Sequence, residues 1–188
     1  METANEEKTY TIEDIFALPD GERAELIDGK IYPMPMTTTT HQRTLGKLFR
    51  EIYSYIIDNN KIGEALTSPF AVVINNDESN LVVPDISVTC DLTKFDERAC
   101  NGAPDWIVEI VMQESRVMDY FIKPTKYWKA GVREYWIVDP ADKLVTVYGY
   151  VNGCDGKVEI THYKLGEEVP VGIYSGFSIK IPDNLQIT

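Results

Sequence analysis

The chain has 188 residues, of which 44% are hydrophobic and 26% are charged. This composition suits a folded protein with a sizeable core and excludes a largely disordered one. The net charge of −12 argues against broad affinity for nucleic acid, because phosphate binding requires Lys and Arg. No apolar run approaches the length that spans a bilayer, so we expect no contact with a membrane.

We expect one domain over residues 1–188, with residues 1–8 flexible. The acidic N-terminus lacks the apolar segment of a signal peptide. The three cysteines, Cys90, Cys100 and Cys154, show no metal-ligand spacing. We interpret them as reduced thiols and place the protein in the cytoplasm.

The first predicted elements are a helix, a hairpin and a longer helix. Thr11 is a suitable N-cap for a short helix, and Asp28-Gly29 predicts a tight turn between strands at 23–27 and 30–34. The longest helix is expected over residues 41–58, capped by Thr39. Its apolar residues recur at helical spacing and predict one buried face: Leu45, Leu48, Phe49, Ile52, Tyr53, Ile56 and Ile57.

The second half of the chain is rich in strand patterns. Strands are expected at 64–66, 70–74, 81–90 and 105–111, with a polar loop at 91–104. A helix at 115–130 ends at Gly131, and shorter strands follow at 134–138, 144–148, 158–163, 168–171 and 177–181. This order predicts a mixed α/β (α+β) fold in which helices flank a mixed β-sheet.

Two of these strands each carry one carboxylate among apolar residues. Asp85 lies in the run 81–88 and Glu109 in the run 106–111. A buried charge is costly unless it is paired or bound to a cation. Neighbouring strand ends could present both acids, with the main-chain carbonyl of Ile110, to Mg²⁺ (or Mn²⁺). Alternatively, Asp85 is a turn residue and Glu109 an exposed residue of an edge strand.

Three further side chains could join such a site. Glu25 occupies the polar position of the hairpin and is either a third acid or an exposed one. His41 opens the long helix and either lies beside the site or serves at the helix end. Lys123 follows Glu109 on the next helix, where it could orient water and stabilise a transition state, or remain solvated.

Basic residues are concentrated on two helices. Residues 114–133 contain five basic residues against two acidic ones, and residues 41–51 contain three against one. The overall acidity therefore leaves room for a local basic face, although two solvated helix faces would give the same pattern. The candidate nucleic-acid contacts are Arg43, Lys47, Lys126 and Lys129.

Several sequence blocks together resemble a large bacterial family of restriction-endonuclease-like proteins in the PD-(D/E)XK nuclease superfamily. The resemblance covers about residues 8–150, and its most specific block ends at Asp139-Pro140. The similar segments are 25–29, His41-Gln42, 83–88, 102–110, Asp119, Lys123, Tyr127 and 130–140.

This resemblance implies a restriction-endonuclease-like core and Mg²⁺-dependent hydrolysis of DNA phosphodiester bonds. It assigns metal binding to Asp85 and Glu109, and it moves the usual catalytic lysine from position 111, which is Val111 here, to Lys123. Similar nucleases often cut duplex DNA as dimers, so a homodimer is expected.

The chain departs from the family at residues 112–115, where a Ser-Pro-Ser-like turn is usual, and at Pro124. Because proline disfavours helix at the residue before it, the helix either begins near Pro124 or is kinked there, and Lys126 is the alternative lysine.

Two other functions stay open. One is a catalytically inactive nuclease-fold module that binds a partner, and the other is a hydrolase of RNA or a nucleotide.

Overall fold

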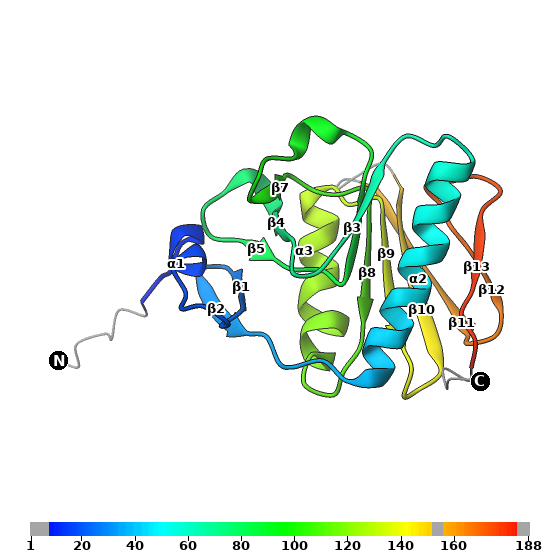
Figure 1. Ribbon diagram of the computed structural model, residues 1–188, viewed down its shortest axis with the longest axis horizontal. Coiled ribbons are helices and arrows are strands. Elements are labelled where there is room, and N and C mark those ends of the chain that lie inside the picture. Colours follow the sequence, from blue (N-terminus) through cyan, green and yellow to red (C-terminus); the bar gives the residue numbers. More distant parts are fainter. Residues whose placement is uncertain (1–7, 152–155, 184–188) are drawn as a thin grey trace.

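A six-stranded mixed sheet lies at the centre of the computed structural model, which describes residues 8–151 and 156–183. Helix α2 (Thr39–Asp58) crosses one face of this sheet and α3 (Lys123–Ala130) the other (Figure 1). Among the described strand pairs of this sheet, only β8 and β9 run parallel. In spatial order the strands are β11 (Lys157–Lys164), β10 (Leu144–Val151), β9 (Glu134–Asp139), β8 (Trp106–Ile110), β6 (Ile86–Thr89) and β3 (Glu64–Thr67). The predicted mixed sheet flanked by helices is confirmed.

A second sheet of five short strands lies beside α3, next to the short helix α1 (Ile12–Phe16) (Figure 1). In spatial order it contains β2 (Lys30–Pro33), β1 (Ala24–Ile27), β5 (Leu81–Val82), β4 (Ala71–Val73) and β7 (Ala99–Asn101). A two-stranded sheet of β12 (Glu168–Pro170) and β13 (Ser178–Lys180) completes the strands, and the short helical turns are η1 (Ile74–Asn76), η2 (Leu92–Lys94) and η3 (Met118–Ile122).

The predicted hairpin is present between β1 and β2. Asp28 and Gly29 both have positive φ, 52° and 73°, as the tight turn requires. A Cβ at Gly29 would also lie 2.4 Å from Thr9 Cγ2, so any other residue there would be strained and would push the Thr9 side chain aside. The turn fixes the register, in which Glu25 faces Tyr32.

The apolar run 81–90 was expected to form one strand, and this is wrong. Its first part is β5 in the smaller sheet and its second part is β6 in the central sheet. Pro84 lies between them and has no N–H to continue a ladder. Both parts are buried, so the apolar pattern does not mark the break. The expected loop at 91–104 also contains η2 and β7, which pairs parallel with β4.

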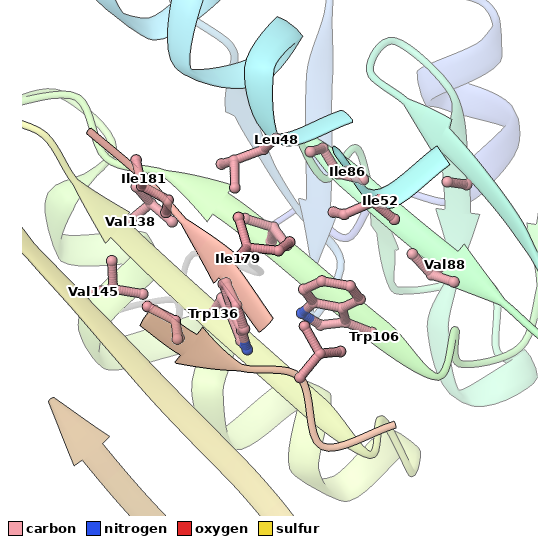
Figure 2. Packing of buried hydrophobic residues seen from close by; sticks show 14 of the residues in the cluster. Leu48, Ile52, Ile86, Val88, Trp106, Trp136, Val138, Val145, Ile179 and Ile181 are labelled. Atoms are coloured by element: carbon pink, nitrogen blue, oxygen red, sulfur yellow. The ribbon is translucent and has the colours of Figure 1, made fainter. Parts of the chain in front are cut away.

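Helix α2 buries a narrower face than its sequence predicts. Leu48 and Ile52 lie over the central sheet, where Trp106 and Trp136 stack edge to face (Figure 2). Tyr53 and Ile57, by contrast, are exposed. The helix is capped by Thr38 rather than Thr39, because the Thr38 side chain accepts a hydrogen bond from the main-chain N–H at position 41.

The predicted helix at 115–130 divides into two parts. A π-helical turn, η3, covers Met118–Ile122, and α3 begins at Lys123 with Pro124 in its first turn. Of the two expected arrangements, a fresh helix start at Pro124 does not fit, because Val117, Ile122 and Lys123 all have right-handed helical dihedrals; the helix instead continues through an irregular π-helical turn just before the proline. Gly131 ends α3 with φ of 94°.

Cys90 and Cys100 are free thiols, and Cys154 lies outside the described residues, as do residues 1–7 of the segment expected to be flexible. None of the helices in residues 8–151 and 156–183 combines the length and apolar character that crossing a bilayer requires.

Two matched substitutions on α2 test this packing. Ile52→Ala should lower the free energy of unfolding by about 3 kcal/mol, because it empties a fully buried position. Ile57→Ala removes the same atoms at a position that is 56% exposed and should cost less than about 0.5 kcal/mol. Urea denaturation of both variants measures the difference, and equal losses would contradict the observed orientation of α2.

Candidate active site

The two strand carboxylates predicted from sequence meet in one buried place. Asp85 lies just before β6, and its N–H donates to Glu109 Oε2 in β8 at 3.3 Å. The Ile110 N–H donates to Asp85 Oδ2 at 2.8 Å. Asp85 is 9% exposed and Glu109 is 4% exposed. Asp85 lies in the bend between β5 and β6, as its turn-residue interpretation has it, but its carboxylate is buried against β8. The exposed edge-strand interpretation of Glu109 is wrong, because β8 is an inner strand of the sheet and the side chain is buried.

Lys123 is the cation at the centre of this cluster. Its Nζ donates to Glu109 Oε1 at 2.8 Å and lies 3.1 Å from Glu25 Oε1 and 3.4 Å from Asp119 Oδ1. The side chain is buried, so the solvated alternative is wrong. Lys126, the other lysine considered, pairs instead with Asp28 in the β1–β2 turn.

Glu25 and Asp119 add two acids to the cluster. Glu25 is buried, and its Oε1 also accepts from the Val83 N–H at 2.9 Å, which ties β1 to the segment before Asp85. Asp119 was noted in sequence only as part of the family resemblance. Its spacing of four residues before Lys123 was the available signal, since helical residues at this spacing share a face.

The turn at residues 112–115, which departs from the sequence usual in the family, makes hydrogen bonds that orient Asp119. The Met112 N–H donates to Ser115 Oγ at 3.1 Å, and this hydroxyl donates to Asp119 Oδ2 at 2.6 Å. The turn therefore holds Asp119 against Lys123 without the usual sequence.

His41 belongs to the site through Asp85. Its Nε2 lies 3.0 Å from Asp85 Oδ2, and the ring is buried at the N-terminal end of α2. Within the described residues, its Nδ1 has no hydrogen-bond partner. One nitrogen thus fixes the orientation of Asp85, while the other is buried without a hydrogen-bond partner among the described residues.

The cluster holds more negative than positive charge. Burial raises the pKa of Glu109 well above its usual value, although Lys123 opposes this rise, and burial also raises the pKa of Asp119. Burial alone would lower the pKa of Lys123, but Glu109, Glu25 and Asp119 together raise it well above the usual value. Lys123 therefore stays charged, and the surplus of carboxylates favours binding of a proton or a further cation.

The main chain at Ile110 is suited to a metal ligand. Val111 N–H bonds to Val138 O in β9, and successive residues of a strand point to opposite sides, so the N–H and carbonyl of Ile110 face the β6 side. The register pairs Ile86 with Val108, which places Pro84 opposite Ile110. Pro84 has no N–H to occupy that carbonyl.

These donors fit a hard cation with few protein ligands. Within residues 8–151 and 156–183, no three His, Cys, Asp or Glu side chains form a complete metal-binding group. The pair Asp85 and Glu109 with the Ile110 carbonyl is the kind of partial, all-oxygen set that Mg²⁺ takes, with water and substrate phosphate completing its coordination. A zinc site would need more nitrogen or sulfur ligands.

The cluster opens into a pocket of about 190 Å³, and all five predicted central residues line it: Glu25, His41, Asp85, Glu109 and Lys123. The four cations expected to contact nucleic acid are not among its described lining residues. Lys47 instead borders a different hollow with Glu51 and Glu168. Arg23, which the sequence did not single out, lies at the pocket.

Comparison with known proteins agrees with this fold. A solved structure, described as a "putative nuclease belonging to DUF820 from Anabaena variabilis ATCC 29413", aligns with a TM-score of 0.69 and 23% identity over 92% of this chain and 96% of that chain. At this identity the similarity shows a shared fold. No curated protein matches the chain.

The fold is thus restriction-endonuclease-like. Residues 12–182 match the Uma2 family, described as "Putative restriction endonuclease", and the protein belongs to this family. The family match confirms the resemblance found in the sequence and supports a nuclease in general terms.

The raised pKa values predict how metal affinity depends on pH. Because burial raises the pKa of Glu109 and of Asp119, a divalent cation such as Mg²⁺ that bound at this cluster would compete with protons for the carboxylates. Affinity should rise with pH until the raised pKa values are passed. Calorimetry in two buffers of different ionisation enthalpy counts the protons released. Binding that is independent of pH and releases no proton would contradict this view.

Tyr127 supports Glu109 and offers a second test. Its hydroxyl donates to Glu109 Oε1 at 2.9 Å. Tyr127→Phe should weaken Mg²⁺ binding about tenfold, because the carboxylate loses an orienting partner. Tyr174→Phe is the control, since the Tyr174 hydroxyl donates to the Ile62 carbonyl at 2.9 Å and to no residue of the cluster. Equal metal affinities for the two variants, measured by calorimetry, would count against the role of Tyr127.

Proposed function

We propose that this protein is a metal-dependent endonuclease that hydrolyses DNA phosphodiester bonds. The observation that carries the proposal is the buried cluster of Asp85, Glu109 and Lys123 at the floor of an open pocket. Membership in the Uma2 family supports a nuclease, and the partial all-oxygen ligand set supports Mg²⁺ or Mn²⁺.

Asp85, Glu109 and the Ile110 carbonyl would hold the cation. A divalent ion in this position supplies Lewis acidity, which makes water more acidic and offsets charge on a phosphoryl group. His41 and the Ile110 N–H keep Asp85 in one orientation, while Tyr127 and Lys123 do the same for Glu109. The acids are thus positioned before any ligand binds.

Lys123 acts on the reacting groups. In the reaction, a water oxygen gives up a proton and forms a bond to phosphorus, the bond from phosphorus to one ester oxygen breaks, and the departing oxygen takes up a proton from solvent. The charged Lys123 ammonium orients the attacking water and offsets the negative charge that builds on the phosphoryl oxygens. Its three carboxylate partners hold it charged near the pocket floor.

The proposal includes a homodimer that acts on DNA in the cytoplasm. Arg43, Lys47 and Lys129 are proposed contacts to phosphates farther from the cut bond, because none is among the described pocket residues. Lys126 would have to leave Asp28 to make such a contact.

A plasmid-nicking assay tests the proposal. Wild-type protein should nick DNA with Mg²⁺ or Mn²⁺ and stop when the metal is chelated. Asp85→Asn and Glu109→Gln should each lower the rate by about 100-fold or more, because each weakens the charge that holds the metal. Asp20→Asn, which alters an exposed acid, is the matched control and should nick normally.

Three results would redirect the proposal. Normal nicking by folded Asp85→Asn and Glu109→Gln proteins would exclude the assigned acids. Cleavage of RNA or a nucleotide instead of DNA would identify a hydrolase of another phosphodiester. Metal binding without hydrolysis of any of these substrates would favour an inactive binding module.

A further inference from the structure

We propose that Arg23 is a substrate-positioning residue that binds a phosphate of the strand being cut. This inference rests on the proposed nuclease function. Arg23 lines the pocket that contains the acid cluster, although it was not one of the cations suggested by the sequence.

The hairpin geometry directs Arg23 to the same side as the acid cluster. Arg23 directly precedes β1, and its carbonyl accepts from the Met34 N–H at 2.8 Å, so the pairing of the hairpin extends to this residue. Alternate residues of a strand share one face, which places Arg23 beside Glu25. Glu25 reaches Lys123 at 3.1 Å, and both Arg23 and Glu25 line the pocket.

Residues of the partner strand β2 and just after it line the pocket on the same face of the hairpin as Arg23 and Glu25. Tyr32 stands opposite Glu25 in the β1–β2 register and also lines the pocket, as does Met34. The tight Asp28-Gly29 turn fixes the register of the two strands. Arg23 is therefore carried by a defined hairpin next to the cluster, with an aromatic ring and a thioether beside it.

Exposure and the lack of a carboxylate partner distinguish Arg23 from the other basic residues that line the described pocket. His41 and Lys123 are buried and face carboxylates, whereas Arg23 is exposed. Arg23 makes no ion pair with another residue in the described parts of the chain. Five acids line the same pocket: Glu25, Asp85, Glu109, Glu114 and Asp119.

An anionic backbone that enters this pocket needs a positive partner at its mouth. Arginine suits this role because its planar guanidinium binds two phosphate oxygens at once. Arg23 supplies the free cation, and the hairpin holds it beside the reacting position. The substrate group that it recognises is a phosphodiester, whichever bases flank it.

The experiment compares full-length wild-type protein with Arg23→Ala, Arg23→Lys and Arg50→Ala. Arg50 is an exposed arginine of α2 outside the pocket, so its removal matches the loss of charge. Binding of a labelled oligodeoxynucleotide is measured by fluorescence anisotropy with Ca²⁺, and KM and kcat are measured for its cleavage with Mg²⁺.

We expect Arg23→Ala to raise Kd and KM about tenfold and to change kcat less than about threefold, because the lost contact is made by substrate and transition state alike. Arg23→Lys should recover part of the affinity, since it keeps the charge without the planar fork. Arg50→Ala should bind within about twofold of wild type, and all melting temperatures should agree.

The outcomes separate this inference from the proposed function. Cleavage with wild-type Kd and KM in Arg23→Ala would overturn the role of Arg23 and leave the nuclease proposal standing. Equal weakening by Arg50→Ala would also overturn it, because general charge would explain the effect. Binding that depends on Arg23 without any cleavage would support the role of Arg23 and end the nuclease proposal. Absence of both binding and cleavage in wild type would end both.

Discussion

The ion cluster around Lys123 is the interaction on which the rest of the structure depends. A buried ammonium is tolerated only with close anionic partners, and here Glu25, Glu109 and Asp119 provide them. These partners come from β1, β8 and η3, while the lysine begins α3. One buried cation therefore joins the hairpin, the central sheet and the helix that covers it, and loss of the lysine would leave three buried acids uncompensated.

Two irregularities of the backbone bring these groups together. Pro84 ends one ladder and lets the chain cross from the smaller sheet to the central one, which delivers Asp85 beside Glu109. The π-helical turn η3 then leads into α3 and presents Asp119 and Lys123 to the same pocket. Such turns are often found at functional sites because they change which side chains share a helix face.

The buried acids of the site outnumber its single lysine. This surplus of negative charge favours binding of a cation at the site. A cation at Asp85 and Glu109 would lower the electrostatic cost of the folded state and prepare the pocket for a phosphate group. This view reconciles a net charge of −12 with a nuclease fold. In the proposed function, phosphate attraction at the site would come from a bound metal and from a few placed cations, rather than from a broadly basic surface.

The sequence by itself determined the local features: the Asp28-Gly29 turn, a helical irregularity next to Pro124, and the burial of the segments that carry Asp85 and Glu109. Short-range backbone sterics and hydrophobic periodicity fix such features. Only the tertiary structure decided that Glu25 and Asp119 both form ion pairs with Lys123 and that Lys126 forms an ion pair with Asp28. It also decided that the apolar run 81–90 serves two sheets. Periodicity reports whether a residue is buried, but it does not report which distant residue it meets.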